Sequence, residues 1–291
     1  MSATLTEKAP AKINLTLRVL GRRADGYHEL ESLVAFADLA DTLTLQMGSE
    51  IGLDITGPFA KKTGSAADNL VLKALAELRQ RIAGLEAGRF LLEKNIPVAA
   101  GIGGGSADAA AALRLIARAN KVALDDPRLA ATALAVGADV PVCLDMAPRI
   151  MRGVGEVLSE PLDLPGLPVL LVNPGVSVVT RDVFNKFVGA QNQSGLAEVP
   201  RQLDPLIEYL QRHDNDLMPA AAACAPVIAE VIAALRGLPG VRLARMSGSG
   251  ATCFALFGSR GEAAAAGQRL KGARKDWWVH ATSVCGTQAN S

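Results

Sequence analysis

A run of four glycines within five residues dominates the middle of the sequence. Gly101 and the triplet Gly103 to Gly105 lie just before an alanine-rich segment, 109–119, that has the composition of a helix. Because glycine has no Cβ atom, an anion can reach the backbone N–H groups of such a loop. A helix that begins here adds unpaired N–H groups and the positive end of its dipole. The pattern predicts a phosphate-binding loop, with a tight structural turn as the alternative.

Two common phosphate-binding signatures do not fit this loop. A Walker loop requires Gly-Lys-Ser/Thr, and no Gly-Lys pair follows Gly105. The dinucleotide fingerprint requires glycine at its first, third and sixth positions, whereas Ser106 is the sixth residue counted from Gly101. A NAD-dependent oxidoreductase therefore remains only as an alternative.

Composition excludes several other classes. The chain has 291 residues, a length that favours two domains. Its 30 Lys+Arg and 29 Asp+Glu nearly cancel, which argues against nucleic acid as a partner. The four cysteines and three histidines are scattered without metal-ligand spacing, so no protein metal site is expected. No apolar run is long enough to span a membrane, and we expect a cytoplasmic protein without a membrane partner.

Hydrophobic periodicity predicts a β-rich start followed by helices around the glycine loop. Strands are expected over 6–20, 27–36, 41–46, 51–55 and 90–93, with helices over 69–81, 109–119 and 127–136. Short connections predict antiparallel pairing of the first strands.

The second half begins after a segment rich in glycine and proline, 153–168, which resembles a domain junction. Strands are expected over 169–172, 241–246, 252–257 and 278–284, with helices over 203–212, 226–235 and 261–273. The polar segment 186–201 is expected to be a loop. This mixture predicts an α+β fold in two halves.

Three segments resemble, in order, the three motifs of the GHMP kinases. They are Lys8 to Leu15, Pro97 to Ala110 and Arg245 to Phe254. The resemblance implies a two-domain GHMP kinase fold. Residues 1–158 would form an N-terminal ATP-binding domain like domain 2 of ribosomal protein S5, and 159–291 a ferredoxin-like C-terminal domain.

Further segments are similar to the GHMP kinases of the non-mevalonate isoprenoid pathway. They are Asp25 to Leu30, Gly137 to Pro141 and Asn173 to Gly175. The resemblance implies that ATP, with Mg²⁺, phosphorylates the 2-hydroxyl of a methylerythritol unit joined to cytidine through a diphosphate. A mevalonate-, homoserine- or sugar-type GHMP kinase and a non-catalytic nucleotide sensor remain alternatives.

The resemblance also implies roles for individual residues. Asp139 would accept the hydroxyl proton, Lys12 would stabilise charge on the transferred group, and Asn14 would orient the hydroxyl. Without the resemblance, Asp139 is more typical of a loop or capping carboxylate beside Gly137 than of a catalytic base.

The cytidine end of the substrate would contact Tyr27, His28 and Phe184, with Thr180 nearby. The alternative for Tyr27 and His28 is half-buried packing after a turn. Relatives often have a second aromatic residue soon after this segment, whereas this chain has Val34. That departure predicts a looser aromatic wall with unchanged chemistry.

ATP would bind the central motif. The residues assigned to it are Pro97, Val98, Ala99, Ala100, Gly101, Ile102, Gly103, Gly104, Gly105, Ser106 and Ala107. Ser106 would lie near the metal-bound β-phosphate, and Asp108 would need magnesium or a capped N–H to offset its charge. The turn from Ser247 to Gly250 would close over the phosphates or the substrate diphosphate; its alternative is a flexible connection.

Overall fold

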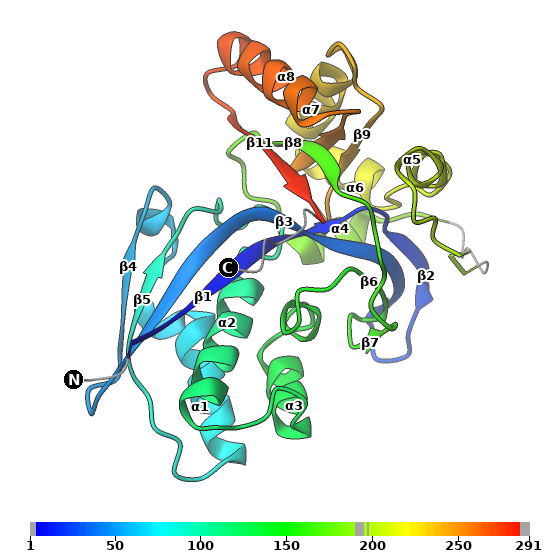
Figure 1. The fold of residues 1–291 in the computed structure, drawn as a ribbon. Helices are drawn as coiled ribbons and strands as arrows, with labels where there is room; N and C mark the ends of the chain where they lie inside the picture. The colour runs from blue at the N-terminus through cyan, green and yellow to red at the C-terminus, as the bar shows by residue number, and fades with distance from the viewer. Residues whose placement is uncertain (1–3, 190–194, 197, 286–291) are drawn as a thin grey trace. The chain divides into compact units, whose positions relative to one another are not determined.

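The chain folds into two compact units that are each built from several stretches of sequence. A computed structural model describes residues 4–189, 195–196 and 198–285 (Figure 1). The first unit comprises Met1–Lys12, Leu39–Val98 and Gly103–Met146, and the second comprises Ile13–Asp38, Ala99–Ile102 and Ala147–Ser291. The domain boundary between residues 158 and 159 stays a prediction.

The long strands at the start of the chain contribute to both units. The strand expected over 6–20 is divided into β1 (Thr4–Asn14) and β2 (Arg18–Arg22), and those expected over 27–36 and 41–46 are one strand, β3 (His28–Met47). Residues 37–40, which lie between these two expected strands, do not interrupt β3, because both ends of β3 pair with neighbouring strands.

In the first unit, β5 (Gly88–Glu93) lies between β3 and β4 (Gly52–Thr56). Phe90 is opposite Leu45 of β3 in an antiparallel register and opposite Leu53 of β4 in a parallel one. The expected antiparallel pairing of the first strands is confirmed for β2 and β3, whereas β4 pairs in parallel with the later strand β5. A parallel neighbour is possible because the chain between β4 and β5 includes a helix, which returns it to the same end of the sheet.

Three helices of the first unit lie together beside its strands (Figure 1). They are α1 (Leu70–Arg81), α2 (Gly104–Ala119) and α3 (Pro127–Val136), and the short turns are η1 (Ala60–Lys62), η2 (Ala66–Asp68) and η3 (Pro141–Cys143). The helix expected over 127–136 is confirmed, with Asp126 accepting from the backbone N–H of Arg128 at its start.

Helix α2 begins earlier than the alanine run suggests. Gly103 has a left-handed backbone and precedes the first helical residue, Gly104, so the last two glycines form the first turn. Glycine disfavours helix interiors, which is why periodicity placed the start at residue 109. Residues 107–117 are all buried, and their alanines allow close packing on every side.

The second unit contains an antiparallel sheet in the order β11-β8-β10-β9. Its strands are β8 (Leu167–Asn173), β9 (Leu243–Met246), β10 (Cys253–Leu256) and β11 (Trp278–Val284). The first half of β3 pairs with β2 and with β6 (Arg149–Gly153), and β6 pairs with β7 (Val157–Leu158). The strand expected over 278–284 is confirmed.

Five helices belong to the described part of the second unit. They are α4 (Thr180–Lys186), α5 (Leu203–Arg212), α6 (Met218–Cys224), α7 (Val227–Arg236) and α8 (Arg260–Ala273). Helices α7 and α8 pack on one sheet face, where Leu170, Val172 and Ala255 join their apolar side chains in a shared core. The short helices α4 and α6 were not expected. Part of the predicted loop 186–201 lies outside the described residues.

The structure bears on the remaining expectations from composition. Within the described residues, no helix combines the length and apolar character needed to cross a membrane. The four cysteines, all within that part of the chain, are free thiols. Burial raises the pKa of Cys143, Cys253 and Cys285 to about 12, so these thiols remain protonated at neutral pH.

Candidate active site

The first unit brings Lys12 and Asp139 together. Lys12 Nζ, near the end of β1, lies 3.1 Å from Asp139 Oδ1, in the loop after α3. The Lys12 side chain is 4% exposed, whereas that of Asp139 is 39% exposed. A buried cation beside a partly exposed carboxylate can hold negative charge on a transferred group while the carboxylate accepts a proton.

The same lysine lies against the beginning of α2. A Cβ added to Gly103 would be 3.1 Å from Lys12 Cβ and 3.2 Å from its Cε. The first turn of α2 therefore places N–H groups close to the Lys12 side chain, and both are suited to negative charge. Three of the predicted ATP-binding residues, Gly103 to Gly105, take part in this arrangement.

The structure requires glycine at some positions of the loop and not at others. Gly101 has φ +74°, and a Cβ there would overlap the carbonyl of Gly250. Gly103 has φ +66°, and a Cβ at Gly104 would be 3.1 Å from Ile96. Gly105 is exposed, its φ is not positive, and a Cβ there would make only an ordinary contact at 3.5 Å. The tight-turn alternative thus accounts for Gly101 and Gly103 but not for Gly105.

The other predicted ATP-binding side chains differ in their exposure. Ala100, Ile102 and Ala107 are buried, so only their backbone groups could contact a ligand. Ala99 is exposed and has a left-handed backbone (φ 53°), and Ser106 is partly exposed in the first turn of α2. The remaining two, Pro97 and Val98, precede these residues in the loop after β5.

A buried ion cluster supports the start of α2. Lys94 donates to Asp41 and, at 2.6 Å, to Asp108 Oδ2, while Asp41 also accepts from the backbone N–H of Ile96. Burial raises the pKa of Asp108 to about 8; Lys94 opposes this rise and Asp41 adds to it. Burial lowers the pKa of Lys94, but the two carboxylates outweigh that effect and leave it raised. Burial thus leaves Asp108 a much weaker acid than an exposed aspartate, and its side chain packs inward against Lys94.

In the second unit, Gly101 and the residue before it lie beside the third motif. The backbone N–H of Thr252 donates to Ala100 O at 3.0 Å, and Ser247 Oγ donates to Gly101 O at 3.3 Å. Ser247 Oγ also accepts from the backbone N–H of Asn14 at 3.1 Å. The Asn14 amide donates to Ser32 Oγ at 2.8 Å. The third-motif turn, 247–250, is thus hydrogen-bonded to Asn14, one of the predicted substrate residues.

A cavity of about 390 Å³ in the second unit contains two predicted substrate residues. His28 and Phe184 line it, and their rings stack with centroids 4.9 Å apart. Phe187 also lines it and meets His28 edge-on at 6.4 Å. Val34 is fully buried and is not among the lining residues, so Phe187 supplies a second aromatic wall that the sequence did not predict.

Two other predicted substrate residues lie differently. Tyr27 is 65% exposed and does not line the cavity. Thr180 Oγ1 lies 2.8 Å from Ser249 Oγ, which links the start of α4 to the third-motif turn. Burial, with a smaller contribution from Arg22, lowers the pKa of His28 below its ordinary 6.5, so its imidazole is neutral at neutral pH.

Comparison with known proteins identifies the class. Residues 69–147 match the model of the GHMP kinases N terminal domain, and 193–275 match that of the GHMP kinases C terminal domain. A homoserine kinase from Cytophaga hutchinsonii, 22% identical, has a similar fold with a TM-score of 0.70 over 98% of this chain and 96% of that one. Fold and matches together define a GHMP kinase.

More similar proteins define the family within that class. A 4-diphosphocytidyl-2-C-methyl-D-erythritol kinase from Rhodopseudomonas palustris (strain ATCC BAA-98 / CGA009) is 54% identical over 97% of both chains. One from Bradyrhizobium diazoefficiens is 54% identical over 96% of this chain and 98% of that one. The crystal structure of a 4-(cytidine 5'-diphospho)-2C-methyl-D-erythritol kinase is 36% identical and has a TM-score of 0.80. The match covers 97% of this chain and 100% of that one. The chain belongs to the family of 4-diphosphocytidyl-2-C-methyl-D-erythritol kinases.

Proposed function

We propose that this chain uses ATP to phosphorylate the 2-hydroxyl of 4-diphosphocytidyl-2-C-methyl-D-erythritol, in the cytoplasm. The single observation that supports the chemistry best is the Lys12–Asp139 pair beside the N-terminus of α2. The identity to kinases of that name over nearly the whole chain supports the choice of substrate. Family membership does not favour the oxidoreductase alternative.

In the proposed reaction, Asp139 accepts the proton of the 2-hydroxyl as its oxygen bonds to the γ-phosphorus of ATP. An alcohol is a much weaker acid than a carboxylic acid, so this transfer occurs late, when the new bond has formed. Lys12 and the N–H groups of the first turn of α2 stabilise the charge that spreads over the transferred phosphoryl group. ADP leaves with the other phosphates.

Mg²⁺ would accompany ATP, shielding its phosphates. Within the described residues, no group of three or more His, Cys, Asp or Glu side chains could hold a metal ion. Asp108 is buried and pairs with Lys94 through Oδ2, so we assign the ion to the Ser106 hydroxyl of this turn. The donor set therefore fits a metal held mainly by ATP and water.

The cytidine would bind in the cavity lined by His28, Phe184 and Phe187. An aromatic wall suits the face of a pyrimidine, and a neutral imidazole can both donate and accept a hydrogen bond. In this proposal Tyr27 closes over the exposed side of the base, Asn14 orients the hydroxyl, and Thr180 lies near the diphosphate.

Coupled ADP release by the purified protein tests this function. We expect turnover with the cytidyl substrate and at most trace turnover with mevalonate, homoserine or galactose. An Asp139→Asn protein, purified in parallel, excludes a contaminating kinase because its activity should fall with the substitution. Turnover of another alcohol, with none of the cytidyl substrate, would contradict the proposal.

A further inference from the structure

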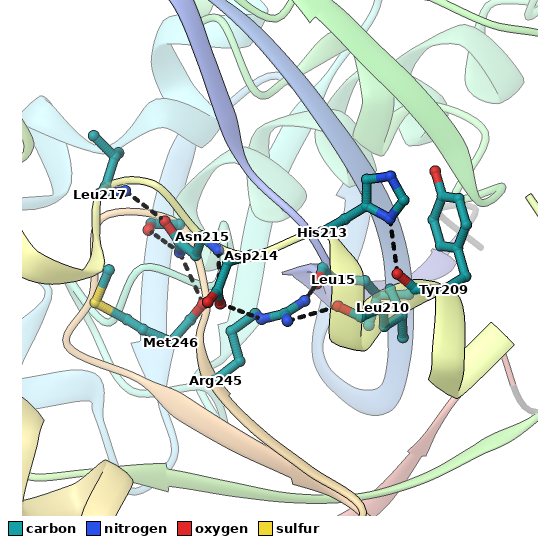
Figure 2. Close-up of polar contacts among 10 residues, drawn as sticks. Leu15, Tyr209, Leu210, His213, Asp214, Asn215, Leu217, Arg245 and Met246 are labelled. Atoms are coloured by element: carbon teal, nitrogen blue, oxygen red, sulfur yellow. Dashed lines mark hydrogen bonds and ion pairs between the residues drawn. The ribbon is translucent and has the colours of Figure 1, made fainter. Parts of the chain in front are cut away.

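The segment that joins α5 to α6 contacts the third-motif turn. Asn215 in this segment is 2% exposed, and its side chain points toward the strand end that precedes the turn (Figure 2). Leu17 pairs with Asn215 as an isolated bridge, and the backbone N–H of Asp216 donates to Leu17 O at 2.8 Å. The segment is therefore fixed by backbone as well as side-chain bonds.

The Asn215 amide bonds on both sides of Ser247. Nδ2 donates to Met246 O and to Gly248 O, both at 2.8 Å, and Oδ1 accepts from the backbone N–H of Leu217 at 3.0 Å. Both amide hydrogens and the amide oxygen are thus used, which fixes the orientation of the side chain. The two carbonyls that it holds belong to the residues immediately before and after Ser247.

Arg245 extends this support to the strand that carries Asn14. The arginine is 4% exposed, and Nη1 donates to Leu15 O at 2.8 Å while Nη2 donates to Leu210 O at 2.7 Å (Figure 2). Its Nε donates to Asp214 Oδ1 at 3.1 Å. The guanidinium therefore connects the residue after Asn14, the last turn of α5 and the segment before Asn215.

From these contacts we infer that Asn215 is a positioning residue for catalysis, acting with Arg245 through the third-motif turn. The inference rests on the proposed function. Asn215 holds the backbone on both sides of Ser247, and the Ser247 hydroxyl in turn bonds to the backbone of Asn14 and Gly101. A shift of the turn would displace the residue that orients the hydroxyl and the start of the glycine loop, although Asn215 itself is buried.

Asn215→Asp tests the inference with little change in size. One carboxylate oxygen would face the Met246 and Gly248 carbonyls in place of the Nδ2 donor, so the turn should move. We expect kcat with the cytidyl substrate to fall at least 10-fold, with KM for ATP and for that substrate within 3-fold of wild type. Misplaced reacting groups reduce turnover more than binding.

Asn120→Asp is the matched control. The Asn120 amide donates to Glu86 O and Ile116 O, both at 2.8 Å, and accepts from the backbone N–H of Glu86, so it makes the same kinds of bond. It lies at the end of α2 opposite Gly104, about 24 Å along a helix of that length. We expect its kcat to stay within 2-fold of wild type and its urea midpoint to fall less than in Asn215→Asp, because its hydrogen bonds are more exposed.

Each kcat is calculated per folded molecule and is measured at urea concentrations below the unfolding transition of that variant. Equal kcat in Asn215→Asp and Asn120→Asp would overturn the inference, because a merely structural role lowers the urea midpoint alone. Asn215→Ser, which keeps one donor, replaces the aspartate variant if that protein does not fold. Wild-type protein without turnover of the cytidyl substrate would instead contradict the proposed function.

Discussion

Lys12 Nζ lies 3.1 Å from Asp139 Oδ1, and the lysine is the buried partner of the pair. The Lys12 stem lies against Gly103 at the start of α2, so the ammonium is held by packing, whereas more than a third of the carboxylate side chain is exposed. The exposed carboxylate can meet an alcohol without breaking the ion pair. This asymmetry supports the proposed roles of Asp139 in proton transfer and of Lys12 in charge stabilisation.

Asp139→Asn should reduce kcat by at least about 100-fold, which is the usual contribution of a positioned base. ATP affinity should stay within about 3-fold, because the substitution keeps the size of the side chain. Steady-state kinetics and ATP titration check this. Asp125→Asn, an exposed carboxylate in the same unit, is the control, and a kcat near wild type in Asp139→Asn would exclude Asp139 as the base.

Gly105→Ala should weaken ATP binding without loss of stability, whereas Gly101→Ala should destabilise the protein. At Gly105 a methyl group meets only an ordinary contact, so the free energy of unfolding should stay equal or rise by up to about 1 kcal/mol, while ATP binds at least 10-fold more weakly. At Gly101 the methyl overlaps Gly250, so the protein should lose at least about 1 kcal/mol. Urea unfolding and ATP titration measure both; wild-type ATP affinity in Gly105→Ala would refute this role for Gly105.

Asp108→Asn should flatten the pH dependence of stability. The pKa of Asp108 rises from 3.8 to about 8 on folding, so its stabilising contribution is complete below pH 3.8 and is lost as pH rises through about 8. An asparagine stays neutral throughout, and the variant should be relatively more stable at pH 9 than at pH 6. Urea unfolding at both values checks this, and the same pH slope in wild type and variant would contradict it.

Asp41→Asn is the contrasting substitution in the same cluster. This substitution removes the charge of a carboxylate that pairs with Lys94 and accepts from the backbone N–H of Ile96. It should lower the free energy of unfolding by at least about 2 kcal/mol. At pH 6 we expect Asp41→Asn to be more destabilising than Asp108→Asn, because the raised pKa of Asp108 favours its protonated form there. Equal destabilisation by the two substitutions would contradict this assignment of the proton.

His28 should make substrate affinity pH-dependent. Burial and Arg22 lower the pKa of His28 below 6.5, so the imidazole is neutral above that pH and gains a proton only in more acidic solution. KM for the cytidyl substrate should be constant from pH 8 to 6.5 and rise below that range, with KM for ATP as an internal control. An NMR titration of His28 that gives a pKa above 6.5 would contradict the prediction.

Sequence periodicity predicted those elements whose ends carry local signals. Asp126 and Pro127 mark the start of α3, and that helix is confirmed. The start of α2 was missed because Gly104 and Gly105 disfavour a helix that tertiary packing nevertheless imposes. Two seven-residue helices, α4 and α6, are too short to show a period.

The candidate site was only partly predictable, for a different reason. Lys12 and Asp139 were assigned through resemblance to a family, since no spacing rule joins residues so far apart in sequence. Asn215 lies in a polar segment between helices that has no motif, and its role depends on carbonyls that sequence does not display. Phe187 follows a helix that was not predicted at all.

Phosphorus NMR of the reaction product tests the central claim most directly. With ATP, Mg²⁺ and 4-diphosphocytidyl-2-C-methyl-D-erythritol, we expect one new phosphomonoester resonance coupled to carbon 2 of the methylerythritol unit, with the cytidine diphosphate signals retained. At equal reaction time the resonance should be at least about 100-fold weaker with Asp139→Asn. Release of inorganic phosphate without this phosphomonoester, or a phosphate on another hydroxyl, would contradict the proposed reaction.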